Sequence, residues 1–167
     1  MYKRQTLHRP SNVDTKENLE KMLNILNFLQ EKVKIFFPIH PRTKKNLEKF
    51  DLEKKIKDLN IVLSNPIGYL EFLNLMTNSK LILTDSGGIQ EEASYLKIPI
   101  LTAREGTERP ITVDEGTNTI IGNDLAKAKK YIEEIISNKY KHGKNIEKWD
   151  GQTAERIVRI IRENLNI

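Results

Sequence analysis

Short apolar runs alternate with amphipathic segments along most of this sequence, and this alternation restricts the fold more than any other feature. Five runs are almost uninterruptedly apolar: 34–40 (KIFFPIH), 60–64 (NIVLS), 80–85 (KLILTD), 98–102 (IPILT) and 119–122 (TIIG). A strand that is apolar along its whole length, rather than at alternate positions, is typical of a sheet covered on both faces. We therefore expect parallel strands with helices on both sides.

Between these runs, apolar residues recur at the spacing of a helix face. The expected helices span residues 14–30, 42–50, 68–78, 88–96 and 124–137, and a last helix over 151–165 follows a polar link. Asp14 and Glu17 are expected to form a capping box at the first of them. The order predicts one α/β domain over residues 1–167, a Rossmann-like, doubly wound parallel sheet of about five or six strands.

Composition excludes several classes of protein. The 167 residues include no cysteine, which removes disulfides, zinc–thiolate sites, iron–sulfur clusters and thiol nucleophiles. No apolar run approaches the roughly 18 residues that span a bilayer, and no signal peptide is recognisable, so we expect a cytoplasmic protein without a membrane partner. The formal net charge is +5, but lysines and glutamates are interleaved, which favours solvated helix faces over a nucleic-acid partner.

Four polar clusters fall at or near expected strand ends: 6–9 (TLHR), 38–41 (PIHP), 84–88 (TDSGG) and 102–105 (TARE). Ligands of such sheets bind beyond the carboxyl ends of the strands. In the third cluster, Ser86, Gly87 and Gly88 lead into a helix, where free N–H groups and the helix dipole favour a phosphate. The alternative is a tight turn in which Glu91 and Glu92 merely favour the dipole.

Other candidates have equally ordinary alternatives. His8 and Arg9 are suited to meet a phosphate or a leaving oxygen, or else form a surface pair. His40 lies between two prolines and is suited to bond either a ligand or the backbone. Arg109 is suited to clamp an anion or to lie in a solvated loop. Phe72 is a base-stacking candidate, although an aromatic residue on a helix is more often core. No His/Asp cluster has metal-ligand spacing, and no cofactor is implied.

The segment 83–93 (LTDSGGIQEEA), followed by 107–110 (TERP), resembles the signature of the non-hydrolysing UDP-N-acetylglucosamine 2-epimerases. The segments 6–14 (TLHRPSNVD), 38–41 and 69–72 (YLEF) also match that family in order and spacing, and the resemblance runs from about residue 8 to 161. Ser11 stands where the family usually has Glu. The residues before His8 do not resemble the apolar strand of the family.

The resemblance implies a GT-B fold, in which two Rossmann-like domains face a cleft, and this chain looks like the C-terminal half. Family members interconvert UDP-GlcNAc and UDP-ManNAc by eliminating UDP and adding it back. The implied partners are therefore UDP, these UDP-sugars and the family's N-terminal domain, with a homodimer left open. The chain alone is expected to be inactive. Two alternatives are a stand-alone UDP-sugar-binding or regulatory module and the nucleotide half of a retaining glycosyltransferase.

The resemblance also implies roles for individual residues. Ser86, Gly87 and Gly88 would hold the diphosphate, and Glu92 would accept hydrogen bonds from the ribose hydroxyls. Phe72 would stack on uracil, and His8 would take a catalytic role beside the diphosphate. His40 and Arg109 would complete the phosphate environment.

Overall fold

The computed structural model describes residues 3–4 and 7–165 of the chain and shows an α/β, Rossmann-like fold, as the sequence predicts. β2 (Ile35–Pro38) pairs in parallel with β3 (Ile61–Ser64). β5 (Ile82–Thr84), β6 (Ile100–Thr102) and β7 (Asn118–Ile120) form a second parallel group in that order. Each of these strands lies within or beside one of the five apolar runs.

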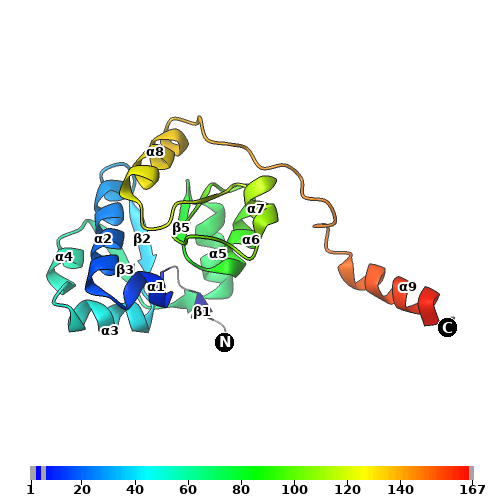
Figure 1. Ribbon diagram of the computed structural model, residues 1–167, viewed down its shortest axis with the longest axis horizontal. Coiled ribbons are helices and arrows are strands. Elements are labelled where there is room, and N and C mark those ends of the chain that lie inside the picture. The colour runs from blue at the N-terminus through cyan, green and yellow to red at the C-terminus, as the bar shows by residue number, and fades with distance from the viewer. Residues whose placement is uncertain (1–2, 5–6, 166–167) are drawn as a thin grey trace.

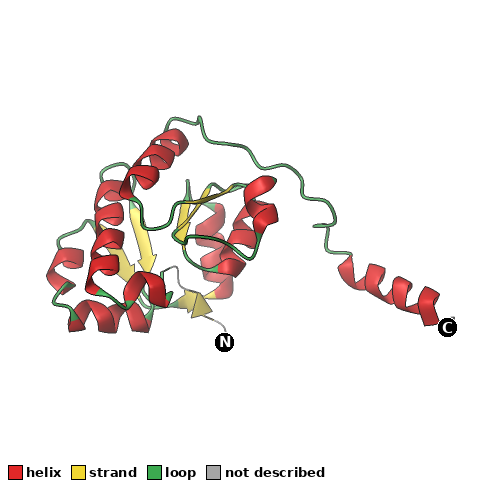
Figure 2. Cartoon of the chain, viewed as in Figure 1, coloured by secondary structure: helices red, strands yellow, loops and turns green. Residues whose placement is uncertain are grey.

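Helices connect and cover these strands (Figures 1 and 2). They are α1 (Pro10–Val13), α2 (Lys16–Gln30), α3 (Pro41–Lys49), α4 (Glu53–Lys57), α5 (Tyr69–Thr77), α6 (Gly87–Tyr95), α7 (Pro110–Asp114), α8 (Leu125–Ile136) and α9 (Thr153–Leu165). None of the helices in the described part of the chain is both long and apolar enough to cross a membrane.

Two details at the N-terminal side differ from the expectation. The expected capping box is wrong, because the N-cap of α2 is Thr15, whose hydroxyl accepts a hydrogen bond from Asn18 N. Asp14 instead pairs with Arg42 of α3. In addition, β1 (Lys3–Arg4) pairs antiparallel with β4 (Ile67–Gly68) and not with either parallel group. Thr6, the first residue of the expected cluster 6–9, lies outside the described residues.

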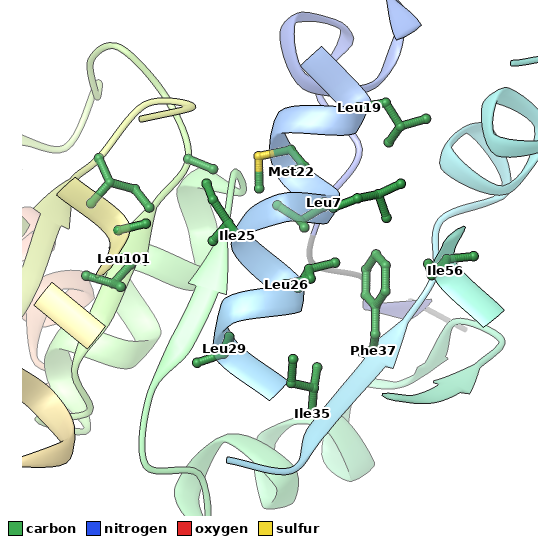
Figure 3. Close-up of a cluster of buried hydrophobic side chains, with 14 of the residues drawn as sticks. Leu7, Leu19, Met22, Ile25, Leu26, Leu29, Ile35, Phe37, Ile56 and Leu101 are labelled. Carbon is green, nitrogen blue, oxygen red and sulfur yellow. The ribbon is translucent and has the colours of Figure 1, made fainter. Parts of the chain in front are cut away.

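The main core joins the two parallel groups of strands. Figure 3 shows α2 burying Leu26 and Leu29 toward Ile35 and Phe37 of β2, with Leu101 of β6 in the same cluster. Each such side chain, when fully buried, contributes roughly 1.5–3 kcal/mol. One layer of helices, α2 and α8, therefore covers one face of both groups.

A second core lies on the opposite face of the second group. Phe72 and Met76 of α5 pack with Ile82 of β5 and with Ile89 and Ala93 of α6. Helices therefore cover both faces of β5 and β6, which explains why these strands are apolar along their whole length.

The C-terminal part of the chain differs from the elements β1 to α8, which we call the body of the molecule. Residues 138–149 form the irregular link that the sequence predicts, anchored by the buried Tyr140. After it, α9 projects away from the other elements (Figure 1), and none of its described side chains is buried.

Candidate functional site

A buried carboxylate organises the edge where β5 ends. Asp85 follows β5, is fully buried, and accepts hydrogen bonds from the backbone N–H groups of His8 (2.9 Å) and Arg9 (2.8 Å). It also accepts one from Asn12 Nδ2 (2.9 Å), and Asn12 donates a second to Ala103 O (2.8 Å). The carboxylate thus fixes residues 8–12 against the ends of β5 and β6.

The same carboxylate orients the imidazole of His8. His8 Nδ1 lies 3.0 Å from Asp85 Oδ1, and the side chain of His8 is 31% exposed. Burial alone would raise the pKa of Asp85, but hydrogen bonds from the His8 side chain, Arg9 and Asn12 outweigh it and hold the pKa below its usual value. An ionised Asp85 favours a proton on His8 Nδ1, which leaves Nε2 as the ring nitrogen for a ligand.

His40, after β2, stacks on His8. The two ring centroids are 5.2 Å apart with an angle of 18° between the planes. His40 Nδ1 accepts a hydrogen bond from Arg42 N (2.9 Å) and caps α3, which confirms the backbone-bonding alternative. Burial and the neighbouring His8 lower the pKa of His40, which favours the neutral form of this ring.

The Ser86–Gly88 turn presents an open helix start beside these histidines. Ser86 is the N-cap of α6, but its side chain makes no capping bond to the helix. Gly88 is exposed, and a Cβ built on Gly87 would meet no atom within 4 Å. The start of α6 is therefore open at Gly87 and Gly88, so an anion can approach its backbone closely.

A buried amide network holds the neighbouring loop against α6. Gln90 Oε1 accepts hydrogen bonds from Thr107 Oγ1 (2.6 Å) and Asn118 Nδ2 (3.0 Å). Asn118 Oδ1 accepts a third bond from Thr102 Oγ1 (2.6 Å). Gln90, Asn118 and Thr102 are fully buried, so the start of α6 and the loop at 103–109 are positioned together.

Ion pairs order the charged loop. Arg109 Nε lies 2.9 Å from Glu91 Oε1, and both side chains are a little over 40% exposed. Arg104 makes two hydrogen bonds to Glu108, which contribute most to lowering the Glu108 pKa to about 2. Any anion that Arg109 binds must share it with Glu91.

Two further predicted residues lie on helices. Glu92 is half-buried on α6, on the same helix as the turn. Phe72 is only 4% exposed and belongs to the second core, which confirms the core alternative for its side chain. A base would reach its ring only after a local rearrangement of α5. Within residues 3–4 and 7–165, no group of three or more acidic or histidine side chains is arranged to hold a metal ion.

Comparison with known proteins decides the family. The family model of UDP-N-acetylglucosamine 2-epimerase matches residues 2–162. This chain belongs to the UDP-N-acetylglucosamine 2-epimerase family. The epimerase of Methanocaldococcus jannaschii is 48% identical over 162 residues, covering 93% of this chain and 43% of the relative. This chain therefore spans less than half the length of that relative.

Solved structures of epimerases share the fold. The structure of the Methanocaldococcus jannaschii epimerase in complex with UDP-GlcNAc and UDP superposes with a TM-score of 0.84 at 46% identity, over 95% of this chain and 44% of that one. The Neisseria meningitidis epimerase bound to UDP-GlcNAc gives a TM-score of 0.70 at 29% identity, over 95% of this chain and 43% of that one.

The structure thus brings His8, His40 and the Ser86–Gly88 turn to one edge. Arg109 forms an ion pair with Glu91 of α6, and Phe72 is buried in the second core. The sequence analysis missed Asp85, Asn12 and Gln90 as positioning residues. One signal was available for Asp85: an acidic residue at the end of an apolar run is buried with the strand and needs partners.

Proposed function

We propose that this chain is the UDP-binding half of a non-hydrolysing epimerase that interconverts UDP-GlcNAc and UDP-ManNAc. The observation that carries the proposal is the open start of α6 at Ser86–Gly88, which lies beside His8, a histidine oriented by a buried carboxylate. Family membership and the relatives crystallised with UDP-GlcNAc support the same ligand here.

The geometry suits stabilisation of a departing diphosphate. When the bond between the sugar C1 and the diphosphate oxygen breaks, negative charge gathers on UDP. The first-turn N–H groups at Gly87 and Gly88 and the Arg9 guanidinium are donors suited to that charge, and His8 Nε2 becomes one when both ring nitrogens carry a proton. Glu92, on the same helix, is the proposed acceptor for the ribose hydroxyls. Uracil stacking on Phe72 would require α5 to shift, because that ring is buried.

Elimination also needs a base at the sugar C2, which takes the C2 proton as UDP leaves. Glu91 is paired with Arg109, and Glu92 lies on the nucleotide side of the site. We therefore propose that the base belongs to the N-terminal domain of the family and that this chain alone binds UDP without epimerising UDP-sugars. Elimination and re-addition are redox-neutral, so the proposed reaction uses no cofactor.

Calorimetry with UDP tests the binding role. Glu92→Ala should weaken UDP binding by about 1.5–3 kcal/mol, the range for a hydrogen bond to a charged group. Glu133→Ala, an exposed acidic residue on α8, is the matched control and should leave the affinity unchanged. Equal affinities for all three proteins would remove Glu92 from the site.

Proton NMR in deuterated water tests the proposal that the base at the sugar C2 lies outside this chain. The C2 proton signal of UDP-GlcNAc should stay constant with this chain alone, while the uracil lines broaden on binding. Loss of the C2 signal over time, abolished by His8→Asn, would contradict the proposal that the base lies elsewhere.

A further inference from the structure

The backbone of Arg109, in the loop between β6 and β7, is held on both sides by threonine hydroxyls. Arg109 N donates a hydrogen bond to Thr107 Oγ1 (3.0 Å), and Arg109 O accepts one from Thr112 Oγ1 (2.7 Å). These bonds fix the two peptide groups that flank Arg109, and with them the direction in which its side chain leaves the loop. The side chain itself is 44% exposed, so the restraint acts on an arginine that a ligand can reach.

Both hydroxyls are bonded to one pair of buried amides. Thr107 Oγ1 donates to Gln90 Oε1 (2.6 Å). Asn118 Nδ2 donates to Gln90 Oε1 (3.0 Å) and to Thr112 Oγ1 (3.0 Å). The hydrogen bonds thus form a closed ring, which begins at Arg109 N and returns to Arg109 O through these four side chains. Because Gln90 and Asn118 are fully buried, opening the ring at either amide would leave buried polar atoms without their partners.

Gln90 connects this ring to the start of α6, the helix that begins at Gly87. Glu91, the next residue, lies one turn after Gly87 on the same face, and a helical side chain leans toward the N-terminus of its helix. Arg109 Nε lies 2.9 Å from Glu91 Oε1. The guanidinium therefore lies over the face of α6 that begins at Gly87.

The guanidinium of Arg109 has N–H groups to offer an anion at that place. Nε lies beside Glu91, and Nη1 donates to Glu108 O (3.2 Å). A guanidinium carries several further N–H donors in the same plane, in a fixed arrangement that matches phosphate oxygens. The position of the Arg109 backbone decides whether these donors reach an anion that is bound at Gly87.

We propose that Gln90 and Asn118 are positioning residues for Arg109, whose guanidinium completes the diphosphate site at the start of α6. This inference rests on the proposed function, because the anion is the diphosphate of UDP. Both amides act on binding through the backbone of Arg109. A network that only stabilised the fold would instead weaken every contact at the turn, with or without the Arg109 side chain.

A double-mutant cycle in the full chain distinguishes these two roles. In calorimetry with UDP, Gln90→Met and Arg109→Ala should each weaken binding by about tenfold. Adding Gln90→Met to Arg109→Ala should change the affinity by less than about twofold, because no guanidinium remains to be misplaced. Equal losses from Gln90→Met in both backgrounds, or an unchanged affinity of Arg109→Ala, would overturn this inference and leave the proposed function standing. Absence of UDP binding by the wild-type chain would overturn the proposed function, and this inference with it.

Substitutions at the half-buried Thr107 test the ring while Gln90 Oε1 keeps its bond from Asn118. Thr107→Val removes the hydroxyl and keeps the shape of the side chain, so UDP binding should weaken by about tenfold. Hydrogen exchange of the Arg109 amide in the free chain should become faster by about tenfold or more, because that N–H loses its acceptor. Thr107→Ser keeps the hydroxyl, is the matched control and should behave as the wild type in both measurements. Equal behaviour of the two variants would contradict the proposed role of the ring.

Discussion

The carboxylate of Asp85 positions four groups of the candidate site. They are the backbone N–H groups of His8 and Arg9, the side-chain amide of Asn12 and the imidazole of His8. The partners come from residues 8–12, more than 70 positions away in sequence. Their positions therefore depend on the tertiary fold, in which α1 packs at the end of β5. The sequence predicts a polar cluster here but does not predict which member orients the others.

Asp85→Asn tests this organisation. The amide replaces one acceptor oxygen with a donor, so buried donors of residues 8–12 lose their partner. We expect the free energy of unfolding to fall by roughly 1–3 kcal/mol at neutral pH, as measured by urea denaturation. Asp58→Asn, at an exposed position after α4, is the matched control and should change it little.

The pH dependence of the same variant has a definite sign. The folded pKa of Asp85 is lowered, so its stabilisation is present above the unfolded pKa of about 3.9 and is lost as the pH falls through the lower folded value. The stability difference between the wild type and Asp85→Asn should therefore shrink below about pH 4. A difference that stays constant down to pH 2 would contradict the assigned charge.

At the scale of elements, periodicity predicted the α/β alternation well because apolar runs and helix faces are local features. It missed α4 and α7, which are each 5 residues long. It also could not predict the β1–β4 pairing, in which Lys3–Arg4 and Ile67–Gly68 form a two-residue ladder without an apolar run. Short pairings of this kind depend on which strand edges the rest of the fold leaves near each other.

A substitution at the start of α6 allows an effect on UDP binding to be distinguished from an effect on the stability of the fold. Gly87→Ala adds a Cβ into open space, so the free energy of unfolding should stay within about 1 kcal/mol of the wild type. The same Cβ should obstruct close approach of a diphosphate and weaken UDP binding tenfold or more, as measured by calorimetry. An unchanged affinity would remove the turn from the site.

Gly116→Ala is the contrasting variant for the fold. A Cβ there would lie 2.5 Å from Thr112 O and 2.6 Å from Ser94 Oγ. It should lower the free energy of unfolding by about 1–3 kcal/mol, the range for overpacking. The pair thus distinguishes a glycine kept for ligand access from one kept for packing.

At the scale of the whole molecule, the body and α9 differ in how they are held. The body has a continuous core from α2 across β2 and β6 to α8. α9 has an apolar face, with Ile157 and Ile161 each about half exposed, and no buried residue. The helical periodicity of 151–165 predicts such a face correctly, but periodicity alone does not say whether another element covers it.

Truncation at two points should therefore give different results. A chain ending at Asp150 loses α9 and the surface pair between Asp150 and Arg156, which is worth about 0–1 kcal/mol, so its unfolding midpoint in urea should barely move. A chain ending at Asn138 also loses Tyr140, which is 6% exposed and donates a hydrogen bond to Thr117 O (3.0 Å). That loss should cost about 3–5 kcal/mol, the range for removing a large buried aromatic side chain.

Tyr140→Ala in the full chain checks that the second effect comes from this side chain rather than from the backbone removed with it. Burial raises the pKa of the Tyr140 phenol to about 12, which agrees with a hydroxyl enclosed by β6 and β7. The variant should reproduce most of the destabilisation of the shorter truncation. If instead the chain ending at Asp150 already lost several kcal/mol, contacts of α9 would contribute to the stability of the rest of the molecule, which would contradict the prediction.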